Sequence, residues 1–179
     1  LPSRQHVVLE GVDAGRGDGR VLPQVEFGIE RVPRPRDQRR EVRLRTHRPG
    51  DIGWVISQHG ELYWREYGWD IRFESFVARI AADFVDQFDA GREVCYIAVR
   101  DEGATEERLG CAFVVKQDDR VAKLRMVLLV PDARGLGIGK RLVRACIDFA
   151  AQAGYQRMTL WTNDVLHAAR AIYIAEGFQ

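Results

Sequence analysis

The amino-acid sequence predicts an α+β (α/β mixed) fold, a mainly antiparallel twisted sheet with helices on both of its faces. Between residues 94 and 130, apolar runs are separated by short polar turns, a pattern typical of successive strands that pair antiparallel. Two segments with helical spacing precede these strands, and a glycine-rich turn with a third helical segment follows them. A last strand and a last helix close the chain. Helices placed before and after the strands can cover both apolar faces of the sheet.

The first half of this pattern begins with a strand at residues 42–45, where apolar and charged side chains alternate before a Pro-Gly-Asp turn. Residues 52–68 form a short aromatic helix. The helix expected at 72–89 carries an apolar stripe. That stripe consists of Phe73, Phe76, Val77, Ile80, Phe84, Val85 and Phe88. Strands are then expected at 94–100, 109–116 and 121–130.

The second half continues with a helix from Ile138, whose apolar residues recur at helical spacing, and with a strand at 157–162. The last helix carries Leu166, Ala169, Ile172 and Tyr173 on one face, and Gly177 stands where a C-cap glycine belongs. The sequence therefore predicts one domain at residues 42–179. Residues 1–41 are rich in Arg, Pro and Gly and lack helical or strand periodicity, so we expect an extended arm or linker there.

The composition is that of an ordinary small enzyme domain. Hydrophobic residues make up 46% and charged residues 30% of the chain, and the formal net charge is +1, so no strong field directs it to nucleic acid or membrane. No apolar run could span a bilayer, and no leader is evident. The three cysteines fall inside expected strands or helices and are expected to be reduced and buried, which favours a cytoplasmic protein.

The most informative segment is the glycine loop, residues 134–140, between an apolar strand and a helix. Its sequence is Arg134, Gly135, Leu136, Gly137, Ile138, Gly139 and Lys140. Closely spaced glycines before a helix leave backbone N–H groups at the positive end of the helix dipole, which suits a phosphate. A Walker loop would need Ser or Thr after Lys140, where Arg141 stands, and a dinucleotide fingerprint would need Gly-x-Gly-x-x-Gly.

The pattern that the loop does match, Arg-x-x-Gly-x-Gly at Arg134, Gly137 and Gly139, resembles the coenzyme A pyrophosphate loop of the GNAT N-acetyltransferase superfamily. A second motif resembles the same family: Asn163 at a strand end, then a helix with Tyr173-x-x-x-Gly177-Phe178. The resemblance implies the GNAT fold and acetyl-CoA as acyl donor. We expect an acetyl-CoA-dependent N-acetyltransferase in which an amine attacks the thioester directly. The alternative is a degenerate module that binds coenzyme A as a sensor or scaffold without turnover.

The resemblance also implies roles for individual residues. The glycine loop would hold the pyrophosphate, and a backbone N–H near Leu129 or Val130 would polarise the acetyl carbonyl. Asn163 would hydrogen-bond the pantetheine arm, and Tyr173 would protonate the departing thiolate. No metal is expected, because the four histidines lack ligand spacing.

The general base is less determined by the sequence. Many family members carry a Glu on the strand before the loop, but residues 124–130 contain no carboxylate. Glu66 and His59, in an aromatic stretch at the position of the family's acceptor-binding helices, are the candidates. The acceptor could be a small molecule or a protein amine, and the sequence does not identify it.

A narrower resemblance concerns residues 59–78, which are similar to the acetyltransferase half of bacterial proteins that fuse a MarR-type helix-turn-helix regulator to a GNAT domain. About 41 residues precede the domain here, too few for a winged helix, so we do not expect nucleic-acid binding from this chain. Family members continue past Gly-Phe with two further strands. Either the given chain is truncated, or another segment fills that place; in the second case we expect residues 6–9 or 25–29, or those of a second protomer, to add a strand at that edge. The open edge and exposed aromatics favour a homodimer.

Overall fold

The computed structural model describes residues 6–10, 41–102 and 105–179. The elements in chain order are β1 (His6–Glu10), β2 (Val42–Thr46), α1 (Asp51–Tyr67), α2 (Ile71–Asp86), β3 (Val94–Glu102), β4 (Thr105–Lys116), β5 (Val121–Leu129), the 3-10 turn η2 (Pro131–Ala133), α3 (Ile138–Gln152), β6 (Arg157–Asn163) and α4 (His167–Ala175). The strands form one sheet in the order β1-β6-β5-β4-β3-β2. Every pair is antiparallel except β5–β6, which α3 connects as a crossover between parallel strands.

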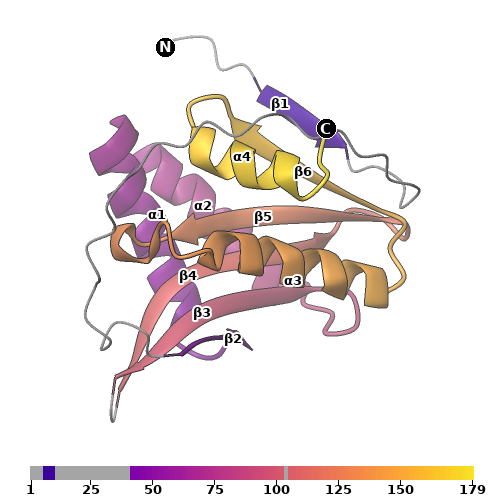
Figure 1. Cartoon of the computed structure of the whole chain (residues 1–179), viewed down its shortest axis with the longest axis horizontal. Coiled ribbons are helices and arrows are strands. Elements are labelled where there is room, and N and C mark those ends of the chain that lie inside the picture. The colour runs from indigo at the N-terminus through magenta and orange to yellow at the C-terminus, as the bar shows by residue number, and fades with distance from the viewer. Residues whose placement is uncertain (1–5, 11–40, 103–104) are drawn as a thin grey trace, which may run out of the picture.

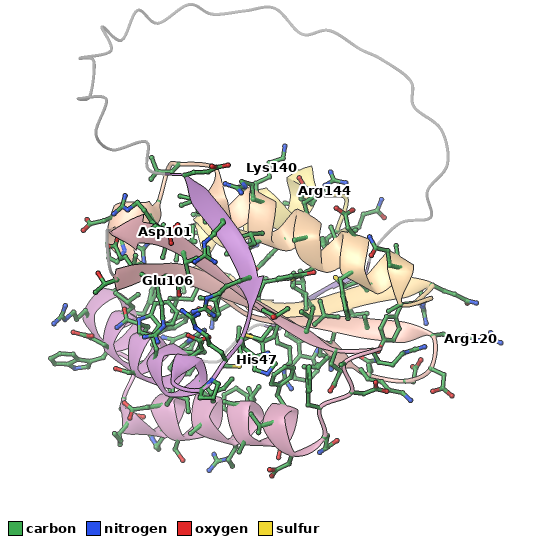
Figure 2. The ribbon with its side chains drawn as sticks, turned by 90° about the horizontal axis from the view of Figure 1, so that it is seen from below. His47, Asp101, Glu106, Arg120, Lys140 and Arg144 are labelled. Atoms are coloured by element: carbon green, nitrogen blue, oxygen red, sulfur yellow. The ribbon has the colours of Figure 1, made fainter. Side chains whose placement is uncertain are left out.

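The helices cover both faces of this sheet, as the sequence predicts. Figure 1 shows α3 and α4 on one face and α1 with α2 on the other, and Figure 2 shows the sheet edge-on between the two layers. Each face has its own core. One core packs Leu109, Leu124 and Leu142 among others, and the second packs Val55 and Phe113 among others. All three cysteines are free and buried in these cores.

Element boundaries differ slightly from the expected ones. Helix α2 ends at Asp86 instead of residue 89, and β4 begins at Thr105, four residues earlier than expected. Phe76 and Phe88, expected on the buried stripe, are 48% and 39% exposed. A stripe as wide as seven apolar residues exceeds what a two-helix layer can bury. In the described part of the chain, no helix combines the length and apolar character needed to cross a membrane.

The outer edge of β6 is covered by β1. The two strands run antiparallel, with His6 opposite Asn163 and Glu10 opposite Thr159. The expectation that residues 6–9 add a strand to this edge is thereby confirmed. The other candidate segment, 25–29, and the rest of the expected arm lie outside the described residues.

A network of charges ties β2 to α1 and β4. The carboxylate of Asp51, whose side chain is fully buried, accepts hydrogen bonds from Arg45 at 2.6 Å and from Arg108 at 2.8 Å. Glu106 pairs with Arg45 at 2.6 Å and with Arg43 at 2.6 Å, and Figure 2 shows Glu106 beside the β2 edge. Because each carboxylate meets more than one guanidinium, the network anchors the start of α1 on the sheet.

Candidate active site

Strands β5 and β6 pair over only part of their length. The parallel ladder runs from Val121 opposite Arg157 to Leu124 opposite Leu160 and stops there. Two residues later, Met126 has φ 52°, the only positive φ of a non-glycine residue in the described chain, and the β4–β5 register shifts between Cys111 and Phe113. A bulge of this kind bends its strand. The bend accounts for the separation of β5 from β6 and for the gap between them.

A cavity of about 440 Å³ occupies this gap and continues under α1 and α2. Its lining comes from five elements, the turn between α1 and α2, and the turn after β6. The residues are His59, Tyr63, Trp69, Phe73, Phe76, Val77, Ile80, Lys123, Leu124, Arg125, Met126, Val127, Trp161, Thr162, Asn163, Leu166, Ala169 and Tyr173. The size is that of a pocket for a drug-sized ligand. Within the described parts of the chain, its lining includes two cations but no Asp or Glu.

The backbone of Leu129 faces this gap. Val130 N–H donates to Leu109 O at 3.0 Å, and Leu129 pairs with Gly110 one step along the antiparallel ladder. Because N–H groups point to alternate edges along a strand, Leu129 turns its own N–H away from β4 and toward β6. The sequence does not decide between Leu129 and Val130 as the polarising amide. The structure rules out Val130, whose N–H is committed to the sheet.

The glycine loop presents open backbone at the N-terminus of α3. Gly135 and Gly137 have φ of 75° and 76°, and no atom lies within 4 Å of where a Cβ would stand on either. Gly137 is the N-cap of α3, and no side chain in the described structure caps it. The first-turn N–H groups of an uncapped helix attract an anion, so the loop fits a diphosphate.

The remaining loop residues have different surroundings. Gly139 is needed for packing, since a Cβ there would stand 2.9 Å from Ile172 and 3.2 Å from Leu129. Ile138 is buried in the core, so it can serve a ligand only through its backbone N–H, whereas the side chain of Leu136 is 46% exposed. Lys140 Nζ lies 3.6 Å from the buried carboxylate of Glu176. Figure 2 shows Lys140 beside the first turns of α3.

Arg134 and Glu66 bind each other instead of entering the cavity. The guanidinium of Arg134 donates to Glu66 Oε1 at 2.8 Å and approaches Leu129 O at 3.4 Å. Glu66 is not among the cavity-lining residues. Glu66 therefore does not stand where a general base for the acceptor amine would be needed. Its position near the end of α1 directs its side chain toward the glycine loop. The contact instead joins that loop to α1.

His59 does line the cavity, but as a neutral and weakly basic group. It is 3% exposed, and its Nδ1 lies 2.8 Å from Val55 O, so Nδ1 carries the hydrogen and Nε2 the lone pair. Burial lowers the pKa of His59 from 6.5 to about 4, against a small opposing effect of that hydrogen bond. At neutral pH the ring is therefore uncharged.

Two tyrosines reach the same cavity from opposite layers, the buried Tyr173 from α4 and the partly buried Tyr63 from α1. Burial raises the pKa of Tyr173, and the neighbouring Tyr63 raises it further. Burial also raises the pKa of Tyr63. Both phenols therefore keep their protons at neutral pH and can donate them. The sequence singles out Tyr173, but it places Tyr63 only within an aromatic stretch.

Polar groups on β6 complete the lining. Asn163 Oδ1 accepts from Val165 N–H at 3.3 Å, which leaves its amide nitrogen as a donor at the strand end. Thr162 is 7% exposed, and its hydroxyl has no hydrogen-bond partner in the described structure. A buried hydroxyl without a partner is costly, so a polar ligand in the cavity would stabilise it. The alternation of side chains along β6 could have predicted that Thr162 is buried, but not that its hydroxyl lacks a hydrogen-bond partner.

No group of three His, Cys, Asp or Glu side chains suited to a metal ion occurs among the described residues. The site is therefore built from backbone amides, two phenols, a histidine, and amide, hydroxyl and cationic side chains. This chemistry can hold an anionic nucleotide at the loop, donate to an oxygen at Leu129 and donate a proton from Tyr173.

Comparisons with known proteins agree with this geometry. The model of the acetyltransferase (GNAT) family matches residues 56–178. An uncharacterized N-acetyltransferase of Schizosaccharomyces pombe is 29% identical over 118 residues, 65% of this chain and 70% of that protein. A probable glucosamine 6-phosphate N-acetyltransferase of Oryza sativa is 31% identical over 108 residues, 56% of this chain and 63% of that protein.

Solved structures share the fold. A GNAT-family acetyltransferase from Staphylococcus aureus aligns with a TM-score of 0.65 at 16% identity, over 78% of this chain and 85% of its own. A predicted acetyltransferase from Clostridium acetobutylicum, crystallised with acetyl-CoA, aligns with a TM-score of 0.59 at 16% identity, over 78% and 90%. With the family model covering most of the sequence and the fold shared by these structures, the chain belongs to the acetyltransferase (GNAT) family.

Proposed function

We propose that this protein is an acetyl-CoA-dependent N-acetyltransferase that moves an acetyl group to a primary amine by direct attack on the thioester. One observation carries the proposal: the glycine loop, with its uncapped helix N-terminus, lies next to Leu129 at the open end of the β5–β6 gap. An elongated donor with a diphosphate at one end and a thioester at the other fits that arrangement.

The loop would hold the diphosphate through the backbone N–H groups of residues 137–140, with Lys140 adding positive charge. When bound, acetyl-CoA supplies an activated acetyl group. Leu129 N–H, aimed into the gap, would donate to the acetyl oxygen. Such a donor contributes on the order of 3 kcal/mol where negative charge develops on that oxygen. Thr162 and Asn163 would bind the polar arm between the two ends.

Tyr173 supplies the proton in this proposal. Its hydroxyl is protonated at neutral pH and its side chain lines the cavity, so it can donate to a departing thiolate. Among the described residues that line the cavity there is no strong base, since His59 is only weakly basic. The nearest charges, Lys123 and Arg125, disfavour an ammonium ion. The acceptor therefore loses its proton on entering, to water or to His59 Nε2.

Two finer points belong to the same proposal. The similarity of residues 59–78 to the acetyltransferase half of MarR-type fusion proteins suggests a bacterial lineage of this family. Three free cysteines and the use of acetyl-CoA favour the cytoplasm as its location.

Release of free thiol from acetyl-CoA over a panel of amines tests the proposal. Glucosamine 6-phosphate belongs in the panel, because the rice relative carries that name. We expect acceptor-dependent thiol release, and we expect Tyr173→Phe to lower kcat by about 10²-fold or more while coenzyme A affinity is kept. Tyr67→Phe is the matched control, since Tyr67 does not line the cavity. Tight coenzyme A binding with no turnover on any amine, and no effect of Tyr173→Phe, would instead favour a sensor.

A further inference from the structure

The acceptor end of the cavity carries two positive charges for which the family assignment gives no role. Lys123 and Arg125 stand two residues apart on β5, and both line the cavity. Leu124 between them packs in the core under α3. Because side chains alternate along a strand, Lys123 and Arg125 point to the opposite face, under α1 and α2. This is the face from which an acceptor can approach Leu129 without crossing the glycine loop.

These two cations lack close counterions. No ion pair joins either of them to a carboxylate among the residues whose side chains the structure describes. Lys123 Nζ lies 4.9 Å above the ring of Trp161. Burial and the neighbouring Arg125 lower the pKa of Lys123. Burial lowers the pKa of Arg125 as well, and Asp83 on α2 only partly opposes this. Each charge is thus partly desolvated without full compensation, which is costly unless an anion binds.

The rest of this end of the cavity is apolar. The side chains of α2 that line this end include Phe76, Val77 and Ile80, and no acid occurs among the lining residues that the structure describes. Among these residues a polyamine would meet only like charge. A small molecule with an aliphatic body and an acidic group would instead find both an apolar wall and two cations.

We propose that the acceptor is a small primary amine that carries an anionic group, a carboxylate or a phosphate, bound by Lys123 and Arg125. This inference rests on the proposed acetyltransferase function and names the substrate class of its site. Arg125 and Leu129 are four residues apart, but the bulge between them shortens their separation to that of Phe113 and Gly110 on β4, roughly 10 Å. The arginine side chain spans a part of this distance, and an acceptor whose amine and acid are separated by several bonds covers the rest.

Matched pairs of amines test the proposal. 6-Aminohexanoate is compared with hexylamine, 3-aminopropyl phosphate with 3-amino-1-propanol, and spermidine serves as the cationic probe. We expect the acidic member of a pair to have the higher kcat/KM, and the better of the two acids distinguishes carboxylate from phosphate. Lys123→Gln and Arg125→Gln should each raise KM for the acidic amines roughly tenfold with kcat little changed, because each removes a charge-assisted hydrogen bond. Their loss of kcat/KM should be much smaller for hexylamine, which carries no acid for either cation to bind.

Two further variants separate a charge effect from a folding effect. Arg125→Lys should recover most of the affinity lost in Arg125→Gln. Arg120→Gln is the matched control, since Arg120 is an exposed cation in the β4–β5 turn, where Figure 2 shows it pointing away from the protein. It should leave all kinetic constants unchanged. Equal use of acidic and neutral amines, or a preference for spermidine, would overturn the proposal.

Calorimetry makes the inference independent of turnover. Protein saturated with coenzyme A is titrated with 3-aminopropyl phosphate and with 6-aminohexanoate. If the protein binds these amines, Lys123→Gln weakens the binding, and no thiol is released with any amine, the anion site is supported and the acetyltransferase activity is refuted. Binding no tighter than that of the neutral amines would overturn the anion site whether or not the enzyme is active.

Discussion

Gly137→Asp separates the folding role of the glycine loop from its binding role. Gly137 has φ 76°, and no atom lies within 4 Å of the point where a Cβ would stand, so the substitution meets no steric clash. Its stability cost is that of a left-handed residue, about 1–2 kcal/mol. For a chain of this length that corresponds to a decrease in Tm of about 2–8 °C. The protein should therefore remain folded at 25 °C.

Coenzyme A binding should respond much more strongly than stability. An aspartate at the N-cap places a negative charge at the N–H groups that bind the diphosphate. Loss of two charge-assisted hydrogen bonds, each about 1.5–3 kcal/mol, corresponds to at least 10²-fold weaker binding. Isothermal calorimetry with coenzyme A measures this, and pantetheine, which lacks the diphosphate, should bind as it does to the wild type.

Gly154→Asp is the matched control for Gly137→Asp. Gly154 lies beyond the other end of α3, has φ 83° and is equally free of neighbours within 4 Å. The Gly154→Asp variant should lose about as much stability as Gly137→Asp, yet bind coenzyme A as tightly as the wild type. If Gly137→Asp binds coenzyme A as tightly as the wild type, or if Gly154→Asp loses as much affinity, the reasoning about the loop is refuted.

Three other variants test the remaining parts of the account. Glu66→Gln removes the half-exposed pair with Arg134, so we expect a change in stability within about 1 kcal/mol and a kcat near that of the wild type, measured by urea unfolding and thiol release; a 100-fold lower kcat would restore Glu66 as the base. His59 has a folded-state pKa of about 4 against 6.5 unfolded, so its stabilisation is complete above pH 6.5 and about 3 kcal/mol is lost as the pH falls toward 4. In His59→Leu this pH dependence should vanish, and a wild-type unfolding free energy that stays flat between pH 6.5 and 4 would contradict the assignment. Asp51→Asn should cost about 3 kcal/mol at pH 7, because it leaves a buried guanidinium partner without its carboxylate. Burial alone would raise the pKa of Asp51, but hydrogen bonds led by that of Arg45 lower it below 3.8. The carboxylate therefore stabilises the fold above pH 3.8, and this stabilisation is lost as the pH falls further. If the unfolding free energies of the wild type and of Asp51→Asn fell by the same amount between pH 4 and 2, this reasoning would be wrong.

Local signals in the sequence accounted for the fold and the glycine loop. Helical and strand periodicity, a Pro before the loop and a C-cap Gly after α4 depend on neighbouring residues alone. Apart from the short turn η2, each element from β2 to α4 lies within four residues of the place where these signals put it. The cavity could not be predicted in this way. It depends on the bulge at Met126, an ordinary residue in a rare conformation, which no local pattern specifies.

The site predictions that the sequence left open or misplaced also depend on tertiary structure. Whether Leu129 or Val130 can polarise the acetyl group depends on which of the two N–H groups points away from β4. The register shift at the bulge determines this. The contact of Glu66 with Arg134 joins segments 68 residues apart, and only tertiary packing brings them together. The cations at Lys123 and Arg125 were visible in the sequence as an alternating pair, but their shared cavity with α2 was not.

The most direct measurement is a crystal structure of the protein with acetyl-CoA. The account predicts the diphosphate on the backbone N–H groups of residues 137–140 and the acetyl oxygen within hydrogen-bond distance of Leu129 N–H. A diphosphate bound elsewhere, or an acetyl group that enters the cavity away from Leu129, would contradict it.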